Sequence, residues 1–195
     1  MKRLVFLAVS IMLGAAALQP AVSQNIIGDR NSVPSGTVTV IDNFEKGNYW
    51  IWAAFDWEQY GPSKLSTSAR VSNRWASEGH QSLECKMIKS TPDSGTDGMY
   101  YMDHRWDFSG ARYIVLDVHN PENSTFTLGI ALQVTDNWRW KELTNVSVRP
   151  GTHTVVLDLS EYAEELYQVM RINICYREDV PMNGRFYVDN LRIIK

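Results

Sequence analysis

Hydrophobic and polar residues alternate along most of the chain after residue 36. A period of two is typical of half-buried β-strands, because successive side chains point to opposite faces of a sheet. Turn signals such as Asn120-Pro121 and Arg149-Pro150-Gly151 separate the runs. The predicted strands are 37–41, 65–72, 83–88, 99–103, 113–118, 126–134, 154–159, 170–176 and 186–194. Only 160–168 resembles a helix, so the pattern predicts an all-β fold, an antiparallel β-sandwich or jelly roll.

In two of these predicted strands, alternate side chains can be assigned to the two faces of the sheet. In the first, the residues predicted to face the core are Phe126, Leu128, Ile130, Leu132 and Val134, and those facing away are Thr127, Gly129, Ala131 and Gln133. In the second, the core set is Met170, Ile172 and Ile174, and the opposite set is Arg171, Asn173 and Cys175. Short and hydrogen-bonding side chains therefore gather away from the core. Such a face is either an ordinary solvated surface or the floor of a polar groove.

The N-terminus has the pattern of an export signal. Met1-Lys2-Arg3 is basic, residues 4–18 are apolar, and Ala21-Val22-Ser23 supplies small residues for cleavage. We therefore predict a signal peptide at 1–23, a linker or disordered lead-in at 24–36, and one domain at 37–195. The mature protein is expected to be secreted or periplasmic, without a membrane span and monomeric.

Composition narrows the possible partners. The chain has 195 residues and a net charge of −3, which becomes more negative once Lys2 and Arg3 are removed. It contains no Lys/Arg-rich run to follow a phosphate backbone, which argues against nucleic acid. The two cysteines, Cys85 and Cys175, lie on opposite parities of their predicted strands, which favours separate thiols over a disulfide.

All seven tryptophans fall between residues 50 and 140. Trp50, Trp75 and Trp106 are interpreted as core residues. A flat aromatic ring covers the apolar face of a sugar, while polar neighbours bond its hydroxyls. We therefore expect the exposed stacking residues to be Trp57, Trp138 and Trp140, and the hydroxyl-binding residues to be Tyr101, Gln133, Arg171 and Asn173.

Several short blocks resemble a galactose-binding-domain-like jelly roll, a fold common among carbohydrate-binding modules. The blocks at the two ends are Ile41-Asp42-Asn43-Phe44-Glu45-Lys46-Gly47 and Phe186-Tyr187-Val188-Asp189-Asn190-Leu191-Arg192-Ile193. Between them, Glu78-Gly79-His80-Gln81-Ser82-Leu83 and Arg149-Pro150-Gly151-Thr152 are similar to the family's early and middle segments. The resemblance implies a β-sandwich that binds polysaccharide or oligosaccharide.

The same resemblance implies a structural calcium ion where the first and last strands meet. Glu45 and Asp189 would be its side-chain ligands, with backbone carbonyls near Gly79 and Gln81, and Asp42 as a weaker candidate. Calcium accepts carboxylate and carbonyl oxygens readily. No organic cofactor is implied.

The leading hypothesis is thus an exported glycan-binding module without catalytic residues. The sequence contains no Gly-x-Ser-x-Gly, no His-Glu-x-x-His and no phosphate loop. Carboxylates such as Asp103, Asp107, Asp117 and Glu142 leave a small secreted polysaccharide hydrolase or lyase open as an alternative. An envelope protein-interaction domain is a further alternative.

Overall fold

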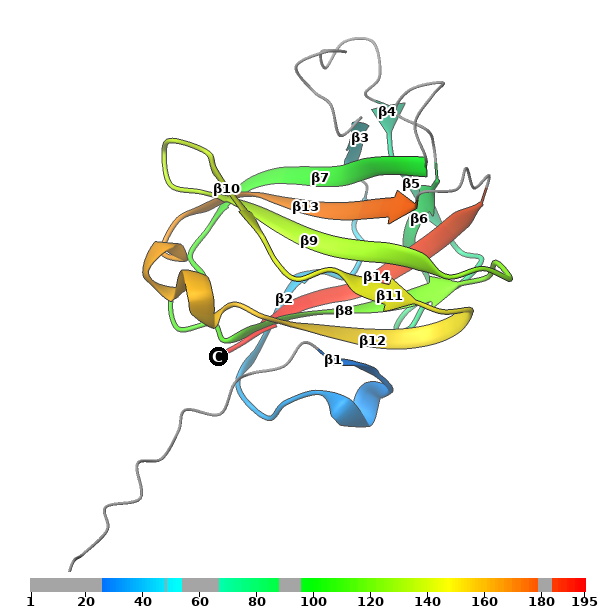
Figure 1. Cartoon of the computed structure of the whole chain (residues 1–195), viewed down its shortest axis with the longest axis horizontal. Coiled ribbons are helices and arrows are strands. Elements are labelled where there is room, and N and C mark those ends of the chain that lie inside the picture. Colours follow the sequence, from blue (N-terminus) through cyan, green and yellow to red (C-terminus); the bar gives the residue numbers. More distant parts are fainter. Residues whose placement is uncertain (1–25, 48, 54–66, 88–95, 179–183) are drawn as a thin grey trace, which may run out of the picture.

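Two antiparallel β-sheets pack face to face in the computed structural model of the chain (Figure 1). The structure describes residues 26–47, 49–53, 67–87, 96–178 and 184–195. The predicted β-sandwich is confirmed, and the fold is built almost wholly from strands. Among the described residues, no helix is long and apolar enough to cross a membrane.

Each sheet is a run of neighbouring strands with one strand branching from it. Sheet A has the order β1 (Ile26–Gly28), β12 (Gly151–Asp158), β8 (Tyr113–Asn120), β14 (Arg185–Ile194), β6 (Ser82–Lys86) and β5 (Arg70–Ser72), with β2 (Val38–Asp42) also on β14. Sheet B has the order β10 (Arg139–Glu142), β9 (Phe126–Val134), β13 (Val169–Glu178), β7 (Thr96–Trp106), β3 (Ile51–Ala53) and β4 (Thr67–Ser68), with β11 (Val146–Val148) also on β9.

The hydrophobic core lies between the sheets and follows the predicted alternation. All five residues assigned to the core face of β9 are buried there. The rings of Phe126 in sheet B and Phe186 in sheet A meet across the interface, with centroids 4.7 Å apart. Such an aromatic pair adds about 0.5–1.5 kcal/mol beyond the apolar area that it buries. Trp50 is buried as predicted, and its indole Nε1 donates to Asp42 at 2.9 Å.

A β-bulge in β13 corrects one of the predicted faces. The register shifts between Val169 and Arg171 against both neighbouring strands. Val169, instead of Met170, therefore joins Ile172 and Ile174 in the core. The helix expected at 160–168 is confirmed in part, as a shorter 3-10 helix, η2 (Ser160–Glu165).

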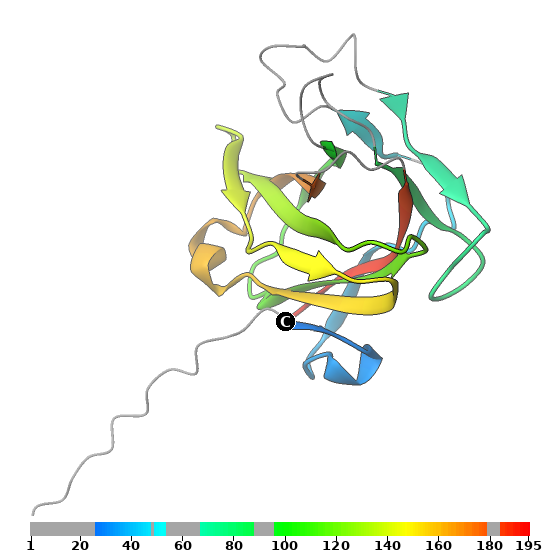
Figure 2. The same ribbon diagram turned by 45° about the vertical axis from the view of Figure 1, so that its right-hand side comes forward.

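The predicted linker at 24–36 is in part folded onto sheet A. β1 pairs with β12, and a 3-10 turn, η1 (Arg30–Ser32), follows it (Figure 2). The guanidinium of Arg30 reaches Asp117 in β8, with Nη2 and Oδ2 3.3 Å apart. The signal-peptide prediction lies outside the described residues.

Both cysteines are buried and free. Cys85 belongs to the main core between the sheets, whereas Cys175 lies in a second small cluster with Met99, Tyr101 and Ala131. The separation predicted from their parities is confirmed. Burial raises the pKa of each thiol, so neither is poised to react.

Two buried carboxylates lie directly opposite each other in sheet A. Asp189 of β14 is the register partner of Asp117 of β8, and both side chains are almost fully buried. Asp189 Oδ2 accepts the backbone N–H groups of Ser77 and Glu78, at 2.7 and 3.0 Å. Asp117 accepts from further donors, which are the hydroxyls of Ser77 and Thr154, the amide of Asn190, and Arg30. The guanidinium of Arg192, also buried, lies 3.7 Å from Asp117.

Replacing Arg192 by methionine should destabilise the fold strongly. The change keeps an unbranched apolar stem but removes a buried positive charge that lies 3.7 Å from the buried Asp117 carboxylate, at an expected cost of about 3 kcal/mol. The free energy of unfolding in urea measures this loss. Arg105→Met is the control, because Arg105 pairs with Asp136 on the surface and its loss should cost less than about 1 kcal/mol. Equal losses would contradict a special role for the buried charge.

Candidate functional site

Most of the predicted glycan-binding residues meet on the outer face of sheet B, in rows that cross the strands. Register pairs place Trp140, Gln133, Arg171 and Asp103 in one row, from β10 through β9 and β13 to β7. Glu142, Ala131, Asn173 and Tyr101 form the next row. Side chains directly opposite each other on one face of an antiparallel pair are in contact range. We call these eight residues, together with Trp138, the polar face.

Arg171 is the centre of the polar face. Its Nη2 donates to Asp103 Oδ2 at 2.9 Å and its Nε to Oδ1 of the same carboxylate, a two-pronged ion pair. The guanidinium carbon lies 4.0 Å from the ring centroid of Tyr101 and 5.2 Å from that of Trp138. Both distances are within the range of a cation–π contact. Arg171 is thus fixed by an ion pair and two aromatic rings.

Two of the three tryptophans predicted to be exposed are at the surface. Trp138 is 40% exposed and Trp140 39% exposed. Trp138 ends the turn between β9 and β10 with a φ of 54°, and Thr135 starts it with a φ of 61°. A left-handed backbone at a non-glycine residue costs on the order of 1–2 kcal/mol. This turn nevertheless holds the Trp138 ring beside Arg171, whereas Trp57 lies outside the described residues.

Two hydrogen-bond acceptors of the polar face, and one in the turn that follows β9, lack partners. Gln133 Oε1, Asn173 Oδ1 and the hydroxyl of Thr135 are buried and make no hydrogen bond within the structure. The amide nitrogens of both side chains are engaged, with Gln133 Nε2 donating to the Trp138 carbonyl and Asn173 Nδ2 to that of Ala131. A buried acceptor without a donor costs about 1–3 kcal/mol. A donor that reached these buried oxygens, from water or from a moved side chain, would recover that cost.

The sequence interpretation of Tyr101 and Asn173 was wrong in one respect. Both were expected to stand on an open polar surface, yet both are buried at the floor of the face. Burial raises the pKa of the Tyr101 phenol, and the neighbouring guanidinium of Arg171 opposes that shift. The phenol is therefore neutral at physiological pH, and the exposed atoms of the face belong chiefly to Asp103, Trp138 and Trp140.

Asp103 and Thr135 were missed as members of the site. Asp103 has the same parity as Tyr101 in β7, so alternation alone could have placed it on this face. Its pairing with Arg171 depends on a register between segments 68 residues apart. Thr135 follows β9 and gave no such signal.

The predicted calcium ligands do not form a cation shell in this arrangement. Glu45 Oε1 accepts the backbone N–H groups of His80 and Gln81, at 2.6 and 2.7 Å. Both oxygens of Asp189 also accept backbone N–H groups, and Asp42 accepts from Phe44 and Trp50. An N–H dipole that points at a carboxylate repels a metal ion from the same position. These N–H donors do not fit the carbonyl oxygens that calcium requires, so we expect Glu45 and Asp189 to be satisfied without the ion that the resemblance implied.

Solved structures with a similar fold are carbohydrate-binding modules. A module specific for non-crystalline cellulose, CBM28, is 17% identical, with a TM-score of 0.58 over 83% of this chain and 97% of that one. The family 11 module from Clostridium thermocellum, in complex with a β-1,3-1,4-mixed-linked tetrasaccharide, is 15% identical, with a TM-score of 0.52 over 83% and 97%. CBM27-1 from Caldicellulosiruptor saccharolyticus, in complex with mannohexaose, is 18% identical, with a TM-score of 0.54 over 82% and 98%.

The fold is thus the β-sandwich of carbohydrate-binding modules, as the sequence resemblance implied. The sequence itself matches no family model and no curated protein. At these identities the likeness concerns the fold alone.

Removing calcium should leave the stability of the protein unchanged. If the carboxylates are satisfied by N–H groups, neither a chelator such as EDTA nor millimolar calcium should shift the thermal midpoint. A ligand bound only to the folded state raises that midpoint by mass action. A midpoint that falls in EDTA and returns with calcium would restore Glu45 and Asp189 as metal ligands.

The contribution of Glu45 to stability should depend on pH in a definite direction. The backbone N–H groups of His80 and then Gln81 hold the pKa of Glu45 below its usual value. Its contribution is therefore fully present above the unfolded pKa, about 4.3, and is lost as the pH falls through the folded pKa. Glu45→Gln should destabilise the protein at pH 7 and have a smaller effect at pH 3, measured by urea unfolding in EDTA. A difference that does not change with pH would contradict this.

Proposed function

We propose that this protein is an exported, non-catalytic glycan-binding module whose ligand lies on the polar face. The observation that carries the proposal is the pair of partly exposed tryptophans, Trp138 beside Arg171 and Trp140 opposite Gln133. A sugar offers several hydroxyl groups and an apolar face of C–H groups. Aromatic rings beside hydrogen-bonding side chains are therefore what a sugar requires.

The comparisons support the same class of ligand. The modules with a similar fold are described as binding non-crystalline cellulose, a mixed-linked tetrasaccharide and mannohexaose. The ligand proposed here is accordingly a polysaccharide or a long oligosaccharide. Trp138 and Trp140 would stack on sugar rings, while Gln133 and Arg171 would bond hydroxyls. The signal-like residues 1–23 support export.

The interactions that the candidate carboxylates already make support binding without cleavage. Asp103 is paired with Arg171, and Glu142 accepts from the Trp140 indole and the Asn145 amide. Asp117 is buried in sheet A, away from both. A glycosidase needs two carboxyl groups that flank one bond, and these groups are engaged elsewhere.

Replacing Trp138 and Trp140 by alanine should abolish glycan binding while leaving the fold intact. Both rings are partly exposed, so each change should move the thermal midpoint little, by roughly 2–4 °C at most. Affinity electrophoresis through gels that contain different soluble polysaccharides measures binding. Tyr167→Ala is the matched control, because Tyr167 is exposed but lies outside the polar face. A large loss of stability in either tryptophan variant would instead make that residue structural.

The same gels separate the proposed function from its alternatives. Retardation in one polysaccharide with unchanged polymer viscosity is the expected result for a binding module. A fall in viscosity would indicate a hydrolase or lyase. If no polysaccharide retards the protein, glycan binding at this face is contradicted and an envelope protein-interaction domain is favoured.

A further inference from the structure

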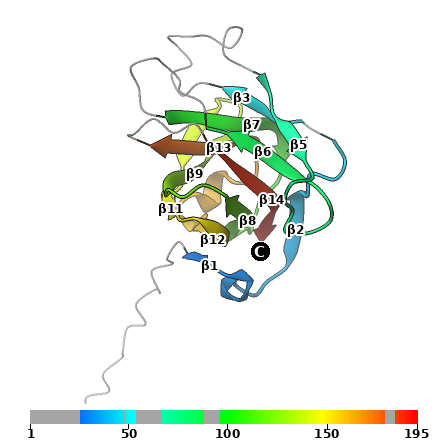
Figure 3. The same ribbon diagram turned by 90° about the vertical axis from the view of Figure 1, so that its right-hand side faces the viewer.

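A hollow opens at the side of the sandwich, between β2 of sheet A and the end of β7 in sheet B. It has a volume of about 630 Å³, and we call it the seam. β2 lies at the margin of sheet A, from which the chain passes to β3 in sheet B (Figure 3). The seam is lined by Val40, Ile41, Asp42, Asn43, Lys46, Tyr49, Met102, Asp103, His104 and Trp106.

The seam results from how the edge strands end. β3 pairs with β7 only from Met99 to Tyr101, so within the described chain residues 102–106 of β7 have no strand on that side. β2 likewise pairs with β14 alone among the described strands. Two unpaired edges therefore face each other, and the space between them stays open.

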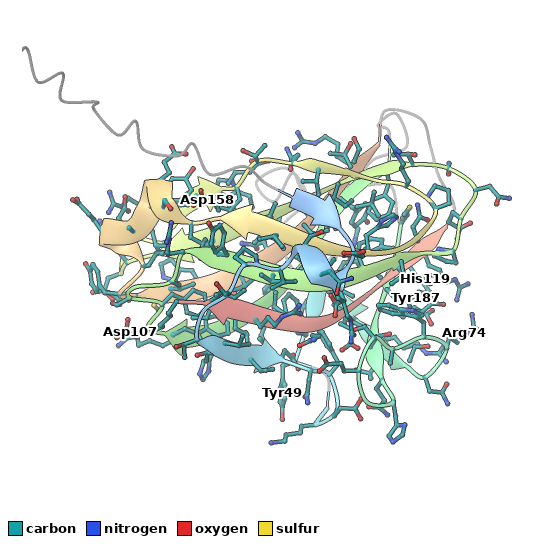
Figure 4. The ribbon with its side chains drawn as sticks, turned by 90° about the horizontal axis from the view of Figure 1, so that it is seen from below. Tyr49, Arg74, Asp107, His119, Asp158 and Tyr187 are labelled. Atoms are coloured by element: carbon teal, nitrogen blue, oxygen red, sulfur yellow. The ribbon has the colours of Figure 1, made fainter. Side chains whose placement is uncertain are left out.

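The lining of the seam, like the polar face, combines aromatic rings with polar side chains. Tyr49 is 67% exposed, and Figure 4 shows its ring directed away from the sheets. The rings of His104 and Trp106 meet edge to face, with centroids 4.9 Å apart. Lys46 and Asn43 add hydrogen-bonding groups to the same wall. An exposed aromatic ring beside polar groups again suits a sugar.

Asp103 joins the seam to the polar face. It lines the seam and also pairs with Arg171 in the row that begins at Trp140. That row crosses four strands, which span about 14 Å at the usual spacing between strands. Because β3 does not extend along β7 to Asp103, the row runs directly over the free edge of β7 into the seam.

We infer that a glycan chain bound along this row continues over the edge of β7 into the seam, where Tyr49 contacts its further sugars. The inference rests on the proposed function and extends it. The ligand is then a linear, neutral chain longer than the polar face. A short oligosaccharide occupies the face alone, and a longer one also reaches Tyr49.

The dependence of affinity on chain length tests this inference. The probes are β-1,4-linked xylo-, manno- and gluco-oligosaccharides of three and six sugars, titrated by isothermal calorimetry. For the series that binds, Tyr49→Ala should weaken the six-sugar chain about five- to tenfold and leave the three-sugar chain unchanged. Tyr49 is well exposed, so the variant should fold, and its thermal midpoint verifies this. Tyr167→Ala, which removes another exposed ring (58%), should change neither.

The contrary outcomes distinguish the two proposals. If Tyr49→Ala binds both lengths like the wild type while Trp138→Ala and Trp140→Ala bind neither, the seam plays no part and the proposed function stands. If the wild-type protein binds no oligosaccharide and no polysaccharide, both proposals fail together.

Discussion

The opposition of Asp117 and Asp189 constrains one whole side of the molecule. Like charges directly opposite each other on neighbouring strands destabilise a sheet, and buried charges do so more strongly unless they are paired. Donors reach the two carboxylates from three segments. Arg30 comes from η1, Ser77 and Glu78 come from the segment after β5, and Asn190 and Arg192 come from β14 itself. Segments far apart in the sequence thus meet on sheet A, because they supply the donors that stabilise the two buried carboxylates.

This constraint makes the two outer faces of the sandwich different. On sheet A the docked segments cover the charges, and the ring of Trp75 stacks on His119 at 5.3 Å, beside Tyr187 (Figure 4). On sheet B the neighbouring strands carry small or amide side chains at the floor, and acceptors there lack donors. The stability of the fold depends on the first face. The second carries the partly exposed rings of Trp138 and Trp140 beside Arg171, which is why the site is assigned to it.

The sequence predicted the strand bounds and side-chain faces that depend on the local alternation of apolar and polar residues. β9 was bounded correctly because its apolar residues keep one parity without interruption, and its outer residues were assigned to the right face. β3 and β10 were missed, since three residues of Ile-Trp-Ala and four of Arg-Trp-Lys-Glu carry too little alternation. The bulge at Val169 left no mark in the pattern. Register between distant strands was likewise not predictable, so neither the pairing of Arg171 with Asp103 nor the opening of the seam could be deduced.

The position of Arg171 bears on the chemistry of the ligand. An arginine on an exposed face ordinarily suggests an acidic polymer, because guanidinium binds carboxylate or phosphate in two-pronged pairs. Here that geometry is already used by Asp103, and the pair carries no net charge. The rings of Tyr101 and Trp138 hold the guanidinium from further sides, so little side-chain freedom remains to be lost on binding. An acidic chain would have to compete with Asp103 and would meet its charge. A neutral glycan meets a fixed surface of rings and hydrogen-bonding groups. Glu142 on the same face adds a further acidic group that would repel an acidic chain, and the polar face therefore favours a neutral glycan over an acidic one.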